Sequence, residues 1–172
     1  ISNFCLGSPN VFDAITLPNS LGIDSFYWNF GEGAGPFEGE STESNSFSTT
    51  GSKTITIEVV ANNGCKDTLT QTINLLDKPT AVITVSDSFI CLGNTVNFNG
   101  INSISNTPGI TYAWDTDFNT GIDNNNVSFI SFANTDLVAM LEVTDDNGCV
   151  DTAFQNLWVV ESPEVDFSTT AQ

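Results

Sequence analysis

Apolar and polar residues alternate with period two along several short stretches of this chain. Residues 54–59 place Ile55, Ile57 and Val59 at alternate positions, the pattern of a β-strand that is buried on one face. Residues 68–76 alternate in the same way, and the intervening Asn62-Asn63-Gly64 is a tight-turn signal, which together predict a hairpin. The sequence shows no convincing helical stripe. The chain is therefore predicted to be all-β.

The sequence also contains an internal repeat. Three motifs of the first half return in the same order after 84 to 86 residues: Cys5-Leu6-Gly7 as Cys91-Leu92-Gly93, Tyr27-Trp28-Asn29 as Ala113-Trp114-Asp115, and Asn63-Gly64-Cys65 as Asn147-Gly148-Cys149. A unit of this length is large enough to fold as a domain. With about seven short strands in each unit, we predict two tandem immunoglobulin-like Greek-key β-sandwiches.

The predicted domains are residues 1–78 and 79–162. Residues 163–168 parallel residues 79–84, so residues 163–172 are predicted to be the first strand of a following module. The first sandwich is predicted to have its own first strand missing or truncated, because the chain enters it almost directly at Cys5. We therefore expect the fragment to come from a longer array.

Charge and missing residue types restrict the chemistry. There are 21 acidic residues against three lysines, with no arginine and no histidine, and the net charge is −18. This charge repels nucleic acid and anionic membranes. Without histidine there is no Ser-His-Asp site and no imidazole zinc site, and without arginine there is no bidentate phosphate clamp. We therefore expect no enzyme, the remaining option being a glycosidase with two converging carboxylates.

Several motifs resemble the PKD (polycystic kidney disease) domain. Residues 27–33, Tyr-Trp-Asn-Phe-Gly-Glu-Gly, resemble its W-D-F-G-D-G hallmark, and residues 51–59 resemble its G-x-Y-x-V-x-L-x-V strand. Residues 63–68 are similar to PKD modules of giant Bacteroidota surface proteins, including gliding-motility-associated adhesins exported by the type IX pathway. The second repeat departs from the hallmark at residues 114–119. The resemblance implies an extracellular or cell-surface location and modules that act as spacers or as protein or glycan binders.

The four cysteines are predicted to form two disulfides, because surface proteins of this composition fold under oxidising conditions. The alternative is four buried free thiols. Repetition favours the pairs Cys5–Cys65 and Cys91–Cys149. In a standard sandwich, however, the first cysteine of each repeat and the last hairpin turn lie at opposite ends. A disulfide between cysteines of different repeats therefore remains an alternative.

Three tryptophans are candidates for either core packing or sugar stacking. Trp28 and Trp114 occupy the position where immunoglobulin-type sandwiches bury a tryptophan, and both are expected in the core. Trp158 has no tryptophan counterpart in the first repeat. It is the most plausible surface aromatic of the three, although a core position is expected for it as well.

Two further motifs suggest surface chemistry. Asp115, Asp117, Asn119 and Asp123 place oxygen side chains at alternate residues, which suits a calcium loop, with a plain acidic surface loop as the alternative. Thr68 and Thr152 each follow an aspartate and resemble the D-[S/T]-[aliphatic] sequon for O-glycosylation of exported Bacteroidota proteins. The alternative is that threonine simply suits a strand.

The expected function is a non-catalytic structural or adhesive repeat segment of a large cell-surface or filament-forming protein. The expected partners are neighbouring repeats of the same chain and other copies in a filament. The alternative is a glycan- or protein-binding accessory module of a secreted hydrolase, which requires exposed aromatic residues. No cofactor is required in either case, calcium is the one ion considered, and neither nucleic acid binding nor membrane insertion is expected.

Overall fold

The structure is a computed structural model that describes residues 4–16, 22–33, 35–116, 119–122, 125–130 and 136–169. The chain divides into two compact units, residues 1–78 and 79–172. The division after Lys78 coincides with the boundary expected from the repeat. All regular structure in the described ranges is β-strand, as the alternating pattern predicted.

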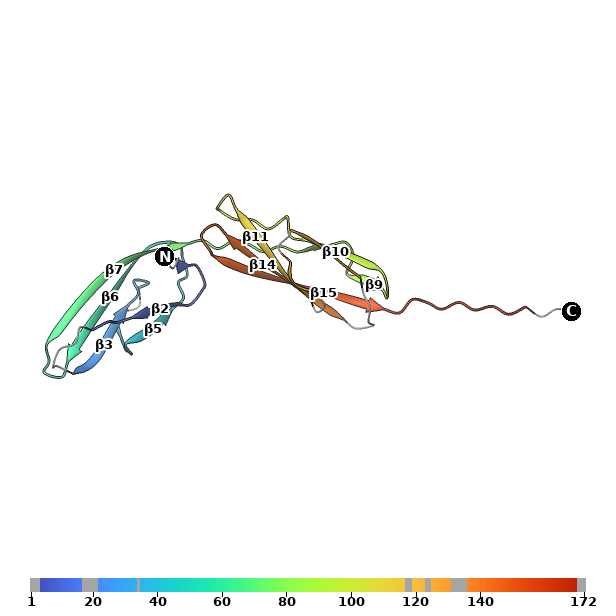
Figure 1. The fold of residues 1–172 in the computed structure, drawn as a ribbon. Coiled ribbons are helices and arrows are strands. Elements are labelled where there is room, and N and C mark those ends of the chain that lie inside the picture. The colour runs from blue at the N-terminus through green and yellow to red at the C-terminus, as the bar shows by residue number, and fades with distance from the viewer. Residues whose placement is uncertain are drawn as a thin grey trace. The chain divides into compact units, whose positions relative to one another are not determined.

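The first unit is a sandwich of two sheets (Figure 1). The larger sheet has the order β1-β7-β6-β3-β4. Its strands are β1 (Phe4–Cys5), β3 (Ile23–Asn29), β4 (Phe37–Gly39), β6 (Gly51–Ala61) and β7 (Lys66–Leu76). The smaller sheet pairs β2 (Asn10–Asp13) with β5 (Thr42–Asn45). The chain alternates between sheets from β2 to β3 and from β4 to β5, as in immunoglobulin-like sandwiches.

The second unit repeats this plan with more strands. Its larger sheet has the order β12-β11-β14-β15-β9, and its smaller sheet has the order β13-β10-β8. The larger sheet consists of β9 (Phe89–Cys91), β11 (Ile110–Thr116), β12 (Asn119–Ile122), β14 (Leu137–Asp145) and β15 (Val150–Val160). The smaller sheet consists of β8 (Thr84–Val85), β10 (Thr95–Asn99) and β13 (Asn126–Ile130).

Each unit has a separate hydrophobic core between its two sheets. Trp28 is central to the first core and Trp114 to the second, and both are almost completely buried. The inward face of β14 shows how the sequence pattern produces this arrangement, because Leu137, Ala139 and Leu141 point into the core at every second position. The predicted all-β, immunoglobulin-like sandwich fold is therefore confirmed.

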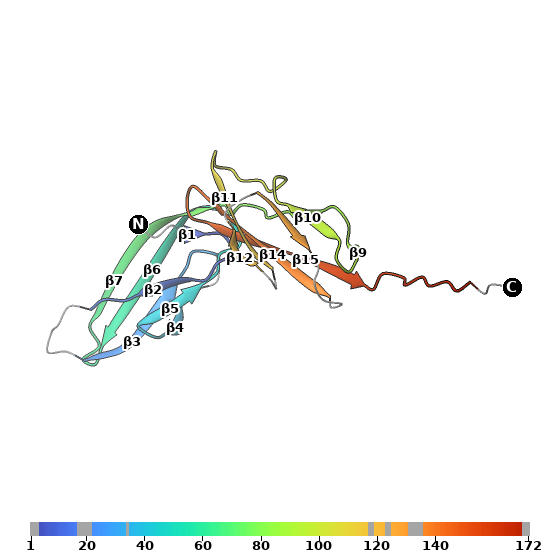
Figure 2. The same ribbon diagram turned by 45° about the vertical axis from the view of Figure 1, so that its right-hand side comes forward.

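The long hairpins that end each unit follow from the turn motif shared by the repeats. β6 pairs antiparallel with β7, and β14 pairs antiparallel with β15 (Figure 2). Gly64 and Gly148 adopt positive φ angles of 83° and 80° in the two connecting turns. This region of backbone conformation strongly favours glycine, which explains the glycine shared by both turns.

Residues 161–169 form no strand in this chain. Val165 and Phe167 are 88% and 84% exposed. Their assignment to the first strand of a following module stays a prediction.

Candidate functional site: a groove along the first sandwich

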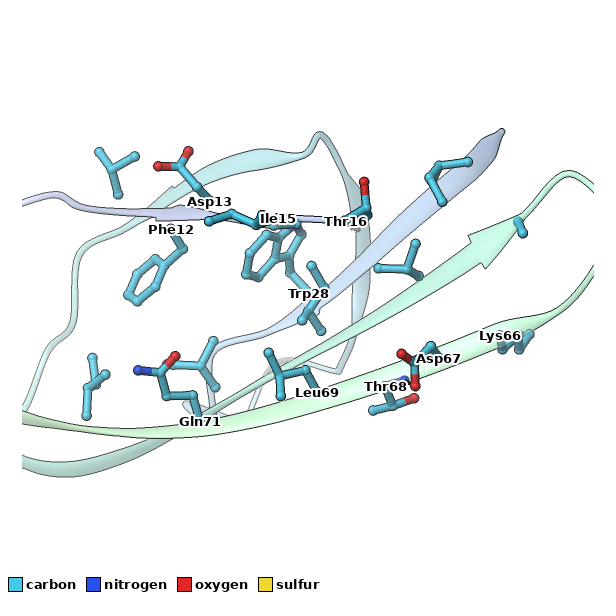
Figure 3. A pocket seen from close by; sticks show the side chains of 18 of the residues that line it. Phe12, Asp13, Ile15, Thr16, Trp28, Lys66, Asp67, Thr68, Leu69 and Gln71 are labelled. Atoms are coloured by element: carbon cyan, nitrogen blue, oxygen red, sulfur yellow. Dashed lines mark hydrogen bonds between the residues drawn. The ribbon is translucent and has the colours of Figure 1, made fainter. Parts of the chain in front are cut away.

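A groove of about 850 Å³ runs along one side of the first unit (Figure 3). Phe12 and Asp13 of β2 border it on one side, and Asp67, Leu69 and Gln71 of β7 border it on the other. The indole of Trp28 lies at its base between the two strands. The groove thus separates the free edge of the smaller sheet from the last long strand of the larger sheet.

The second unit shows what fills the corresponding place. There β8 pairs antiparallel with β10, with Phe98 opposite Val85. Ala81, Ile83 and Val85 pack against the core. Phe12 is the repeat counterpart of Phe98, but no described residue of the first unit pairs with this edge of β2. The groove therefore has the position and the apolar lining needed to bind one extended β-strand.

A carboxylate marks the same position in both units. In the second unit, the backbone N–H of Ala81 donates to Oδ2 of Asp151 at 2.9 Å, which fixes the entry of this segment. The counterpart of Asp151 in the first unit is Asp67, which lines the groove. Its Oδ1 accepts the N–H of Thr68. A carboxylate beside apolar side chains suits an incoming strand with an apolar face and a free N–H group.

Lys66 is the cation at the hairpin end of the groove. Its Nζ lies 2.7 Å from Oε1 of Glu58 on the neighbouring strand. The hydrogen bond from Lys66 to Glu58, with the attraction between the two charges, raises the pKa of Lys66 above its ordinary value. Lys66 therefore stays charged and engaged with Glu58 at neutral pH, which makes it a poor base for catalysis.

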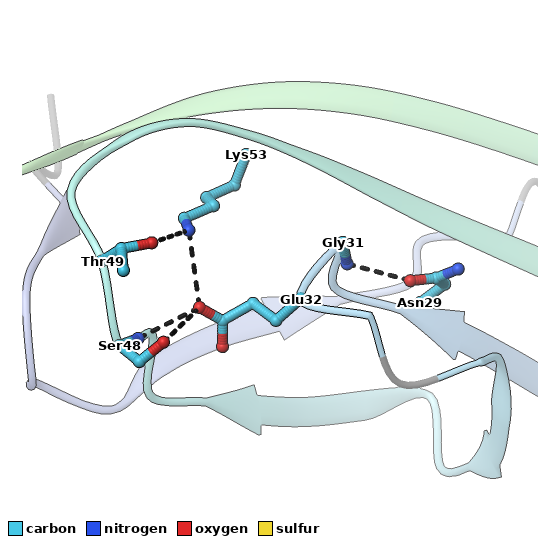
Figure 4. A network of polar contacts seen from close by, with 6 residues as sticks. All are labelled: Asn29, Gly31, Glu32, Ser48, Thr49 and Lys53. Carbon is cyan, nitrogen blue, oxygen red and sulfur yellow. Dashed lines mark hydrogen bonds and ion pairs between the residues drawn. The ribbon is translucent and has the colours of Figure 1, made fainter.

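A second polar feature of the first unit is a network around Glu32 (Figure 4). Its Oε1 accepts hydrogen bonds from the Ser48 N–H at 3.0 Å and the Ser48 hydroxyl at 3.1 Å, and forms an ion pair with Lys53 at 3.4 Å. The bond from the Ser48 backbone is the main cause that lowers the pKa of Glu32 below its ordinary value. This carboxylate thus ties the turn after β3 to the segment before β6.

The turn itself explains part of the PKD-like motif. Gly31 has φ +77°, and a Cβ there would lie 2.7 Å from the carbonyl oxygen of Thr54. The side chain of Asn29 accepts the Gly31 N–H at 2.9 Å. Glycine is therefore required by both backbone conformation and space. These hallmark residues therefore shape the turn after β3.

The predicted disulfide pairs are wrong. Cys5 and Cys149 are each disulfide-bonded, but Cys65 and Cys91 are free thiols. Neither Cys5–Cys65 nor Cys91–Cys149 therefore forms. The expectation of disulfide bonding is confirmed for Cys5 and Cys149, but the expected number of two disulfides is wrong.

Strand register gives the physical reason. In the first unit, Cys5 pairs with Leu76 at the end of β7, whereas Cys65 directly precedes the start of β7 at Lys66. A strand of this length spans about 33 Å. The Cα atoms of a disulfide must approach to within about 7 Å.

The second unit has the same arrangement. Cys91 pairs with Val160 at the end of β15, and Cys149 directly precedes the start of this strand. The two cysteines of each module thus lie at opposite ends of its last strand and cannot reach each other.

Two of the three tryptophans occupy the positions expected for them. Trp28 and Trp114 are core residues, and the Trp28 Nε1–H donates to the Glu40 carbonyl at 2.9 Å. The core position expected for Trp158 is wrong, because this residue is 39% exposed. Its ring stacks on Phe89, which is 61% exposed, with ring centroids 4.9 Å apart. Trp158 points outward because Leu157 and Val159, its neighbours along β15, point into the core.

The predicted calcium ligands are only partly described. Asp115 is exposed on β11, and the backbone of Asn119 begins β12, opposite Thr116. Asp117 and Asp123 lie outside the described residues, so the calcium site stays a prediction. A comparison of melting temperatures in millimolar Ca²⁺ and in EDTA tests it, since binding to the folded state alone raises the melting temperature.

The two predicted O-glycosylation sites lie near the starts of the last strands. Thr68 is an exposed residue of β7, and Thr152 is an exposed residue of β15. Both hydroxyl-bearing residues are open to solvent, as a modification site requires. Their glycosylation stays a prediction.

Comparison with known proteins agrees with this geometry. A family model described as a PKD-like domain matches residues 2–75. The first sandwich is therefore similar to PKD-like domains over nearly all of its length, as its motifs indicated. No curated protein matches the chain in sequence.

Several solved structures are similar to this chain at low sequence identity. The fibronectin(III)-like modules of Clostridium thermocellum CbhA are 10% identical, with 99% of this chain and 95% of that chain covered and a TM-score of 0.44. An amphioxus IgVJ-C2 molecule is 10% identical, with 91% and 99% covered and a TM-score of 0.40.

A further similar structure is Bacteroides ovatus SGBP-B in complex with a mixed-linkage heptasaccharide. It is 16% identical, with 92% of this chain and 42% of that chain covered and a TM-score of 0.35. At these TM-scores, none of the three structures bears on the function of the chain.

The described ranges contain no helix of the length and apolarity needed to cross a membrane.

Proposed function

We propose that this chain is a structural and adhesive repeat segment of a large protein displayed at the cell surface. Its modules act in series as stiff, non-catalytic units. The PKD-like domain match and the disulfide-bonded cysteines support an extracellular setting, because disulfides persist in oxidising compartments.

The observation that carries this proposal is the relationship between the groove and the repeat. The groove of the first unit occupies the place where the second unit holds residues 81–85. Apolar side chains form much of its lining, and among its polar groups Asp67 accepts the Thr68 N–H and Lys66 forms a surface ion pair with Glu58. A groove of this origin is a feature of module assembly. It therefore favours a structural role over a substrate site.

Antibody labelling tests the proposal. An antibody raised against residues 1–172 is expected to label intact cells that produce the full-length protein. Cells expressing the protein with this segment deleted are the control for specificity and are also expected to attach to surfaces less well. Labelling only after permeabilisation would contradict the proposed location, and unchanged attachment would contradict the adhesive role.

A specific observation favours a second candidate function, glycan binding. Phe89 and Trp158 form an exposed aromatic stack on the outer face of the larger sheet of the second unit. Phe154 and Val160 are exposed on the same face of β15. Aromatic faces of this kind stack on sugar rings, and the first repeat has Asn74 at the counterpart of Trp158.

Titration with soluble β-linked oligosaccharides, followed by isothermal titration calorimetry, tests this candidate. Trp158→Ala is expected to weaken binding about tenfold, or about 1.4 kcal/mol. Phe167→Ala removes an exposed aromatic residue of the tail, away from this face of β15, and is the matched control. If both variants bind the oligosaccharides as tightly as the unaltered protein does, the Phe89–Trp158 stack is not a sugar-binding site.

A further inference from the structure

The two free cysteines occupy equivalent strand ends in different modules. Cys65 lies in the turn between β6 and β7 and is exposed, whereas Cys91 ends β9 opposite Val160 and is partly exposed. Each has a counterpart in the other repeat. Cys65 corresponds to Cys149, and Cys91 corresponds to Cys5.

Both counterparts are disulfide-bonded. Each module has an early cysteine, in the Cys-Leu-Gly motif, and a late cysteine, in the Asn-Gly-Cys turn. The early position is disulfide-bonded at Cys5, and the late position is disulfide-bonded at Cys149. Since the early and late cysteines of one module lie at opposite ends of its last strand, about 33 Å apart, a disulfide at either position requires a cysteine outside that module.

We propose that Cys65 and Cys91 form disulfides with cysteines of other modules, each early cysteine pairing with a late one. Cys91 then forms a disulfide with the late cysteine of another module, which lies in an Asn-Gly-Cys turn. Cys65 forms a disulfide with the early cysteine of another module, which lies in a Cys-Leu-Gly motif. This inference rests on the proposed role as a repeat segment. The partner is another module of the same kind, and the result is a chain of modules that is covalently linked from end to end.

Access and local structure suit this role. The Cys65 N–H donates to Oδ1 of Asn63 at 3.0 Å, and the Cys149 N–H donates to Oδ1 of Asp145 at 2.8 Å. Both late cysteines are thus held by a side-chain oxygen of their own turn. Cys91 is followed by a turn in which Gly93 has φ +87°, as Gly7 has φ +76° after Cys5. The free cysteines Cys65 and Cys91 therefore lie in the same kind of turn as their bonded counterparts Cys149 and Cys5.

The reaction requires an oxidant, which we take to be a small-molecule disulfide such as oxidised glutathione. The thiolate of Cys91 attacks this disulfide, forms a mixed disulfide and releases one glutathione thiolate. The thiolate of Cys65 from another copy then attacks the Cys91 sulfur and releases the second glutathione. Two protein thiols are oxidised to one disulfide, and one oxidised glutathione is reduced to two thiols.

The isolated chain tests the pairing rule, because a second copy supplies the complementary cysteine. With oxidised glutathione, the unaltered protein is expected to give dimers, trimers and larger species on non-reducing gels, all reversed by a reductant. Cys65→Ser and Cys91→Ser each leave one free thiol and are expected to remain mostly monomeric. An equal mixture of these two variants is expected to form a dimer linked through Cys91 and Cys65.

Mass spectrometry of the digested dimer identifies the linkage. A persistently monomeric unaltered protein would overturn the proposal. Dimers of a single variant linked Cys65 to Cys65 or Cys91 to Cys91, formed as readily as the mixed dimer, would also overturn the proposal.

Disulfide mapping of the full-length protein from cells is the second measurement. Cys65 and Cys91 are expected in peptides linked to cysteines of flanking modules, and their recovery as free thiols would contradict the inference. Surface labelling by the antibody can still succeed in that case. Failure of the disulfide inference is therefore distinguishable from failure of the proposed function.

Discussion

Phe89 and Trp158 stack with their rings 14° from parallel, on strands that pair in parallel register. The two residues are direct partners across β9 and β15, and both point away from the core. A cross-strand aromatic pair of this kind adds modest stability and leaves two aromatic faces accessible from solvent.

Inward and outward residues of β15 should therefore differ sharply in their effect on stability. Leu157→Ala is expected to lower the free energy of unfolding of the second unit by about 3 kcal/mol, because it leaves a cavity in the core. Phe154→Ala, on the outward face of the same strand, is expected to cost less than about 1 kcal/mol. Urea unfolding followed by tryptophan fluorescence measures both, and similar losses would contradict the assigned faces of β15.

Glu32 predicts a pH-dependent contribution to the stability of the first unit. Hydrogen bonding by Ser48 holds the folded-state pKa of Glu32 below its ordinary value of 4.5. The folded state therefore favours the carboxylate more than the unfolded chain does. The resulting stabilisation is complete above pH 4.5 and is lost as the pH falls through the folded-state pKa.

Glu32→Gln should accordingly lower the melting temperature at neutral pH, and the difference should shrink in acid. The expected loss is below about 1 kcal/mol, since the network is exposed to solvent and screened. Glu164→Gln, in the exposed tail, controls for removing one negative charge. A Glu32→Gln difference that persists unchanged below the folded-state pKa would argue against the Ser48 contact.

The cysteines give a prediction about thiol number. Denatured, unreduced protein is expected to react at Cys65 and Cys91 only, and all four cysteines should react after reduction. Mass spectrometry after alkylation counts the labels and locates them. Labelling of all four before reduction, or of none, would contradict the observed bonding state.

The groove gives a prediction about strand binding. A peptide of residues 161–172 carries Val165 and Phe167 at the counterparts of Ala81 and Ile83, which pack against the second core. Added in excess, it is expected to raise the melting temperature of the first unit by filling the groove beside β2. The matched control is the same peptide with Phe167→Asp, which places a charge toward the apolar lining.

Deletion of residues 163–172 tests whether the tail of one copy occupies the groove of another. If it does, the intact chain should show concentration-dependent association by light scattering, and the truncated chain should not. Equal size and melting temperature of both chains would exclude strand donation by the tail.

Much of the architecture was predictable because it depends on local pattern. Period-two alternation at Ile55, Ile57 and Val59 determines which face of β6 is buried, and glycine at Gly64 permits the turn that follows. The internal repeat then fixed the number of sandwiches and the core positions of Trp28 and Trp114. These features require only neighbouring residues, or a comparison of the two halves of the chain.

The sequence by itself thus determined the β-sandwich class and the approximate module boundary, while the tertiary structure decided which side chains meet. Repeat symmetry suggested Cys5–Cys65, but strand register places these residues at opposite ends of β7. The exposure of Trp158 depends on the inward positions of its two neighbours, and the role of Glu32 depends on Ser48, which is distant in sequence. Contacts of this kind form between segments far apart in the chain, so alternation and spacing along the sequence cannot specify them.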